Sequence, residues 1–86
     1  MIDPFVLEAV AQRVTALGFS DGGIASVRAG FPELRLTFCL EDEMGAAAPY
    51  REYAGFSLYL VNQGDHCLSL TDDPAAAGGV VVAEAG

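Results

Sequence analysis

Apolar residues alternate with other side chains in three short segments, and this alternation constrains the fold more than any other feature of the chain. The segments are 34–40 (LRLTFCL), 56–61 (FSLYLV) and 66–71 (HCLSLT). Because successive side chains of a strand point to opposite faces, each segment predicts a half-buried strand. Leucine and phenylalanine form the inner face, and the outer face carries Arg35, Thr37, Cys39, Tyr59, Cys67 and Ser69.

Residues 4–17 have a different period, which predicts an amphipathic helix. Asp3 suits the N-cap, Pro4 the first helical position, and Gly18 the stop after the last turn. The apolar residues recur at helical spacing and form one stripe: Val6, Leu7, Val10, Val14 and Leu17. A helix of this kind packs its stripe on the leucine face of a sheet.

The rest of the chain supplies shorter elements and no linker between domains. In chain order we expect a turn at 20–23, a strand at 24–29, a helical turn from Pro74 capped by Asp73, a break at Gly78-Gly79 and a strand at 80–84. The sequence therefore predicts a single α+β domain over residues 1–86. Its architecture is one N-terminal helix packed on a four- or five-stranded, mostly antiparallel sheet.

The second and third alternating segments predict a hairpin. Residues opposite one another in an antiparallel pair share a face, so leucines should meet leucines. Pairing Leu60 with Leu68 and Leu58 with Leu70 satisfies this rule and leaves NQGD, residues 62–65, as the loop.

The charge of the chain restricts its partners. Twelve acidic side chains face four arginines, which gives a net charge of −8 on 86 residues. Such a field repels phosphate backbones and anionic membranes, so we expect neither nucleic-acid nor membrane binding. It favours a protein partner with a basic surface. The N-terminus lacks a secretory pattern and no run is apolar enough to span a membrane, so we expect a cytoplasmic protein with free thiols.

His66 and Cys67 are adjacent and raise the question of a chemical site. Adjacent strand residues point to opposite faces, which disfavours both a shared metal and a catalytic Cys-His pair. Cys39 and Cys67, in contrast, share the outer face and could together hold a soft metal or an iron–sulfur cluster. The alternative is that both cysteines are small apolar residues of a half-covered sheet.

The segment 41–55 (EDEMGAAAPYREYAG) is long for a connection in a small domain, and long loops are often functional. An acidic run, 41–43, is followed by residue types that are enriched at binding hot spots. We therefore expect a partner to contact the loop and the outer sheet face through Met44, Tyr50, Arg51, Tyr53, Arg35 and Tyr59. The alternative reading is that Tyr50 and Tyr53 only cap the edge of the core.

The run PYREYAGFSLYLVNQGDHCLSLTDDP, with the later GGVVVAE, resembles a small bacterial protein family of unknown function associated with nitrogen-fixation gene neighbourhoods. The resemblance covers residues 49–84 and rests on structural motifs. It implies a cytoplasmic accessory protein acting around metallocluster enzymes, and it brings no catalytic residue.

These observations predict a non-enzymatic, acidic accessory or adaptor protein without a cofactor. It docks through loop 41–55 and the outer sheet face, which is apolar enough to need cover from a partner or from a second copy in a homodimer. A second hypothesis is a small metal- or cluster-handling protein that uses Cys39 and Cys67. A third, an enzyme with a small-molecule cleft between helix and sheet, has the weakest support because its best candidate residues, His66 and Asp65, fit a turn.

Overall fold

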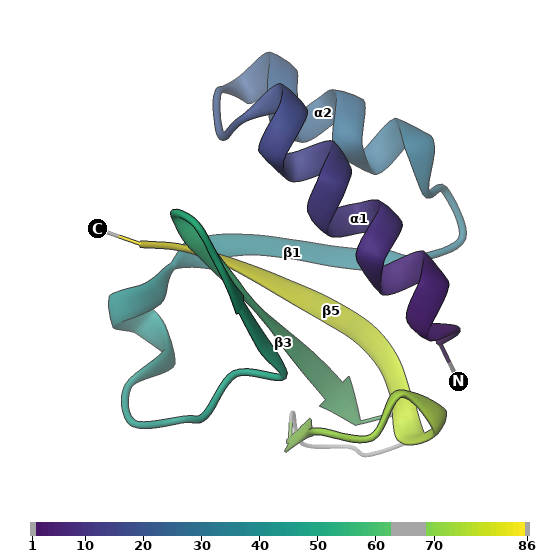
Figure 1. The fold of residues 1–86 in the computed structure, drawn as a ribbon, viewed down its shortest axis with the longest axis vertical. Coiled ribbons are helices and arrows are strands. Elements are labelled where there is room, and N and C mark those ends of the chain that lie inside the picture. The colour runs from purple at the N-terminus through teal and green to yellow at the C-terminus, as the bar shows by residue number, and fades with distance from the viewer. Residues whose placement is uncertain (1, 63–68, 86) are drawn as a thin grey trace.

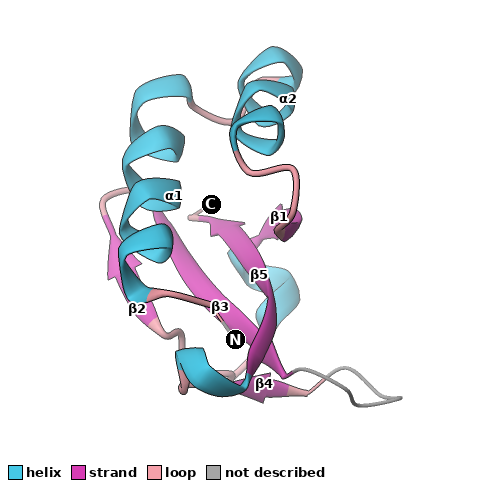
Figure 2. Cartoon of the chain, turned by 90° about the vertical axis from the view of Figure 1, so that its right-hand side faces the viewer, coloured by secondary structure: helices cyan, strands magenta, loops and turns pink. Residues whose placement is uncertain are grey.

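Two helices lie side by side on one face of a five-stranded sheet (Figures 1 and 2). The computed structural model describes residues 2–62 and 69–85. The predicted α+β class is confirmed, including the N-terminal helix and the number of strands. The sheet is mixed: one strand pair is parallel and the other pairs are antiparallel.

Helix α1 (Pro4–Leu17) forms where the apolar stripe predicts it. The Asp3 side chain accepts a hydrogen bond from Phe5 N at 2.9 Å and caps the helix start. Gly18 ends it at a φ of 76°, a backbone conformation that favours glycine. The side chains that α1 buries are Leu7, Val10, Ala11 and Val14.

Helix α2 (Asp21–Gly30) contradicts the predicted turn at 20–23 and strand at 24–29. The Ser20 hydroxyl accepts a hydrogen bond from Gly23 N at 3.1 Å, so the serine that looked like part of a turn is the N-cap of a helix. Ile24 and Val27 are three residues apart, a spacing that puts them on one face of a helix but on opposite faces of a strand. Full burial of Val27 against the core decides for the helix and outweighs the poor helical propensity of the glycines.

The sheet has the strand order β1-β5-β3-β2. Strand β1 (Arg35–Leu40) runs parallel to β5 (Ala77–Glu84), and β5 runs antiparallel to β3 (Phe56–Asn62). The other edge of β3 is shared: β2 (Arg51–Tyr53) pairs with its first half and β4 (Leu70–Thr71) with its second half. Strand β1 therefore ends the sheet on one side.

The predicted hairpin register is wrong for β4. The structure pairs Leu60 with Thr71 and Val61 with Leu70, so Leu70 lies on the outer side with Val61 and is 40% exposed. The predicted partner Leu68 is outside the described residues. Arg51 of β2 already occupies the position opposite Leu58, so β4 pairs only with the end of β3.

The last strand is longer than predicted. The Asp73 cap is confirmed, because its side chain accepts from Ala75 N at 3.0 Å at the start of the short helix η2 (Pro74–Ala76). Strand β5 follows directly at Ala77, so the expected break at Gly78-Gly79 is wrong. Gly79 pairs with both Arg35 and Val61, whereas Gly78 falls at a register shift of the β3–β5 ladder, which the strand passes without ending.

The core has a main part and a smaller part on opposite faces of the sheet. The main part fills the space between helices and sheet with Leu7, Val10, Val14, Val27, Leu36, Phe56, Leu58, Leu60, Val80 and Val82, among others. The smaller part lies on the outer face around Tyr59, Val81 and Ala83. Burial of apolar surface on both faces explains why β3 and β5 are buried along most of their length.

Candidate protein-interaction surface

Residues 41–50, here called the covering segment, fold over the outer face of the sheet. The segment starts with the short helix η1 (Glu41–Met44) directly after β1. Met44 and Ala47 pack against Tyr59, Val81 and Ala83. The outer face predicted to need cover from another chain is covered at its centre by this one, and Tyr59 is only 3% exposed.

The two tyrosines of the predicted docking loop pack against the main core. Tyr50 N donates a hydrogen bond to Leu58 O at 2.8 Å, which continues the β2–β3 ladder. The ring of Tyr53 stacks on that of Phe56 with a centroid separation of 5.0 Å. These contacts support the reading that both rings cap the edge of the core.

Arg51 and Tyr53 meet the same carboxylate on α1. Glu8 Oε1 accepts a hydrogen bond from Arg51 Nη1 at 2.9 Å and another from Tyr53 Oη at 3.1 Å. Burial, followed by the hydrogen bond to Glu8, raises the pKa of Tyr53. The sequence did not predict that Glu8 would bind Arg51 and Tyr53. Its only local signal was a charge beside the apolar stripe of α1, and contact with β2 depends on the tertiary fold.

Four carboxylates lie in or directly beside the covering segment: Glu41, Asp42 and Glu43 on η1 within it, and Glu52 on β2 just after it. We call this group the acidic rim. Burial raises the pKa of Tyr59, and the nearby negative charges of Glu41 and Glu52 raise it further. Within residues 2–62 and 69–85 the sole ion pair is Glu8–Arg51, so the rim charges are not neutralised there.

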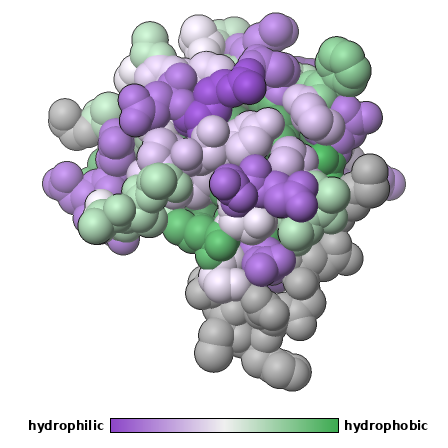
Figure 3. Space-filling view, turned by 60° about the horizontal axis from the view of Figure 1, so that its bottom comes forward, coloured by the Kyte–Doolittle hydropathy of each residue, from purple (hydrophilic) through white to green (hydrophobic). Residues whose placement is uncertain are grey.

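The side of the molecule that carries the covering segment is hydrophilic over most of its area, with small apolar areas between the polar groups (Figure 3). Of the predicted contact residues, Arg35 and Arg51 are exposed, whereas Met44, Tyr50 and Tyr53 are half-buried and Tyr59 is buried. The structure thus brings Met44 and Tyr59 together as packing partners. It leaves Asp42, Glu43 and Glu52 exposed and Glu41 half-buried, and Glu52 was not among the predicted contact residues.

Cys39 lies beside Met44 on the outer face, with 3.8 Å between Cys39 Sγ and Met44 Sδ. Burial and the nearby Glu43 carboxylate raise the pKa of the Cys39 thiol. Cys67, Asp65 and His66 are outside the described residues, so the predicted cysteine pair cannot be placed. No cluster of three or more potential metal ligands occurs in the part of the chain that the structure describes.

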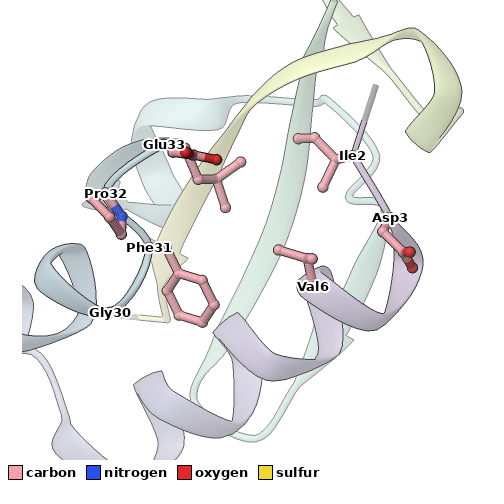
Figure 4. A pocket seen from close by; sticks show the side chains of 8 residues that line it. Ile2, Asp3, Val6, Gly30, Phe31, Pro32 and Glu33 are labelled. Carbon is pink, nitrogen blue, oxygen red and sulfur yellow. The ribbon is translucent and has the colours of Figure 1, made fainter.

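Two of the open pockets on the described surface are lined by residues of α2 and of the chain around β1. The larger, of about 380 Å³, separates the start of α1 from the connection between α2 and β1. Ile2, Val6 and Phe31 point into it, whereas the carboxylate of Asp3 points away and caps α1 (Figure 4). The other, of about 290 Å³, has Cys39, Glu43 and Glu84 in its lining.

The fold and surface define a small acidic α+β protein with a self-covered sheet. No helix among the described residues is both long and apolar enough to cross a membrane. The chain belongs to a family of unknown function, DUF6129, whose model matches residues 9–85. No curated protein and no solved structure matches it. The family match extends well beyond residues 49–84, on which the resemblance rested, and it carries no link to nitrogen fixation.

Proposed function

We propose that the protein is a non-enzymatic adaptor that docks on a basic surface of a partner protein through the acidic rim. The observation that carries the proposal is the set of unneutralised carboxylates, Glu41, Asp42, Glu43 and Glu52, around the covering segment. A surface of one sign attracts a partner of the other sign and speeds their encounter.

The structure changes the part that each predicted contact residue plays in this proposal. Tyr59 and Met44 hold the covering segment in place, and Tyr50 and Tyr53 fix β2 against the core. In this proposal the partner protein contacts the acidic rim and the exposed side chains of Arg51 and Arg35. A rigid support of this kind lowers the entropy cost of binding.

The partner class rests on the resemblance to proteins encoded near nitrogen-fixation genes. It points to a metallocluster enzyme, or a protein that assembles one, in the cytoplasm. Electrostatic docking of this kind weakens as salt rises, because exposed charges are screened within about 8 Å at 0.15 M ionic strength.

Anaerobic affinity purification from the native host, followed by mass spectrometry, tests the proposal. The rim variant is Asp42→Asn/Glu43→Gln/Glu52→Gln. The matched control, Asp21→Asn/Glu33→Gln/Asp72→Asn, removes the same charge from exposed positions elsewhere. We expect one stoichiometric companion that the control retains and the rim variant loses. A companion retained equally by both variants would refute the rim as the docking surface, and an eluate of this chain alone would refute the adaptor function.

The 3.8 Å approach of Cys39 Sγ to Met44 Sδ supports a second candidate, soft-metal handling. The raised pKa of Cys39 opposes it, since the thiolate is the metal ligand. The test is the iron, zinc and copper content after reducing, oxygen-free purification. Metal that disappears in Cys39→Ser and in Met44→Leu would support this candidate. Metal that persists in Cys39→Ser/Cys67→Ser would exclude it.

A further inference from the structure

Strand β1 is an open edge of the sheet. Within the described residues it pairs with β5 alone, whereas β2 and β4 cover the far edge of β3 (Figure 2). β1 is six residues long, and the strands at the opposite edge have three and two residues. An edge strand of this length presents a row of unpaired N–H and C=O groups that can pair with another strand.

Side chains at both ends of β1 are also exposed. Leu40 is 50% exposed, although it is a large apolar residue at the end of the strand. Arg35 at the other end is exposed and has no ion pair in the described part of the chain. Glu41 directly follows the strand, and it too has no ion pair among the described residues. An apolar residue and two opposite charges therefore stand along one unpaired edge.

We propose that two copies of this chain associate through β1, as an antiparallel pair centred on Phe38. Residues opposite one another must share a face. In this register Leu36 lies opposite Leu40 of the second copy and Thr37 opposite Cys39, and Arg35 comes next to Glu41, the first residue of η1 after the second copy's β1. Two-fold symmetry repeats every contact, so the interface covers both exposed leucines and forms two Arg35–Glu41 pairs.

Self-complementarity is what selects a second copy over an unrelated extended peptide. A shift of one residue would place the leucines opposite outer-face side chains. Centring the pair on Thr37 instead would set Arg35 opposite Cys39 and lose both charge pairs. Of these three registers, only the one centred on Phe38 places apolar residues opposite apolar residues and a cation beside an anion.

Two features oppose the association: the net charge of each copy and a hydrogen bond at the end of β1. The net charge of −8 on each copy is repulsive, but salt screens it beyond about 8 Å at 0.15 M. Glu43 Oε2 accepts a hydrogen bond from Leu40 N at 3.3 Å, so pairing at this end has to displace a long contact. The inference does not rest on the proposed function: both involve Arg35 and Glu41, but the rim variant that tests that function changes neither residue.

A charge swap measured by sedimentation velocity at 0.15 M salt tests the pairing. The wild-type chain should show a concentration-dependent equilibrium between monomer and dimer. Arg35→Glu and Glu41→Arg should each raise the dimer dissociation constant roughly tenfold, because like charges then face each other twice. The double variant Arg35→Glu/Glu41→Arg should restore the wild-type dissociation constant. A monomer at all concentrations, or a dimer indifferent to the swaps, would overturn the proposal, and melting curves check that each variant folds.

A disulfide trap tests the register. In a Cys67→Ser background, Thr37→Cys places a new thiol opposite Cys39 of the second copy, at the close Cα spacing that a disulfide needs. Oxidised glutathione should convert this variant to a covalent dimer. It should leave Arg35→Cys in the same background monomeric on a non-reducing gel. The reverse pattern would overturn the register centred on Phe38, and no covalent dimer in either variant would overturn the pairing itself.

Discussion

Glu8 on α1 and Tyr53 on β2 are joined by a hydrogen bond of 3.1 Å across 45 residues of sequence. Arg51 donates to the same carboxylate oxygen at 2.9 Å. The two bonds tie the first helix to a three-residue edge strand that has few other contacts with the helical layer. They also fix the end of the predicted docking loop, so Glu52 of the acidic rim stands on a supported strand.

Removing the phenol hydroxyl of Tyr53 should weaken this tie. We expect Tyr53→Phe to lower the free energy of unfolding by about 1 kcal/mol, the usual net worth of one hydrogen bond. Urea denaturation measures it. Tyr50→Phe is the matched control, because the Tyr50 hydroxyl has no hydrogen bond in the described residues, and it should change stability little. Equal losses in both variants would contradict the assigned role of the Glu8 contact.

The two tyrosines with raised pKa values should make stability fall at high pH. Burial raises the folded-state pKa of Tyr59 above the ordinary value of 10.0. Its contribution is therefore complete below pH 10 and is lost as the pH rises through the raised value, because the unfolded chain ionises first. Denaturation from pH 8 to 12 should show this loss, and Tyr59→Phe should flatten it. Absorbance titration that finds Tyr59 ionising at or below pH 10 would contradict it.

Met44 should anchor the covering segment. Truncation in Met44→Ala removes its packing on Tyr59 and Val81, and we expect a loss of about 1–2 kcal/mol because the site is only half-buried. Amide exchange in residues 41–50 should quicken and the pKa of Tyr59 should move toward 10. Phe5→Ala is the control, since Phe5 is 85% exposed. Unchanged exchange in the segment would show that other contacts hold it.

Adjacent glycines at the start of α2 should respond in opposite ways to a methyl group. A Cβ at Gly23 would lie 2.5 Å from Leu17 O and 2.8 Å from Gly18 O, whereas one at Gly22 meets nothing within 4 Å. Gly23→Ala should destabilise the protein by more than about 1 kcal/mol, and Gly22→Ala should stabilise it by about 0.5–1 kcal/mol. Thermal unfolding of both variants gives the comparison. Equal effects would disprove the close approach of α2 to the end of α1.

The sequence predicted only part of the candidate surface formed by the acidic rim and the covering segment. The acidic run 41–43 and the unusual length of 41–55 singled out the segment that folds over the outer face of the sheet, and its role in binding stays a prediction. Alternation alone could not show that Met44 and Ala47 would turn back onto the outer face, because that contact depends on where β1 ends relative to Tyr59 of β3. The same limit hid Glu8, whose partners lie more than 40 residues away.

The local pattern by itself determined the elements whose period was long and consistent. Helix α1 with its Asp3 cap, the alternation of β1 and β3, and the cap at Asp73 all follow from side-chain spacing and hydrogen bonding within a few residues. Only the tertiary structure established the helix over 21–30, because the sequence there has just two large apolar residues, Ile24 and Val27, too few to define a period. It also decided the parallel pairing of β1 with β5 and the register of β4. The physical reason is common to these cases: the deciding free energy comes from burial against residues distant in sequence, which no local pattern contains.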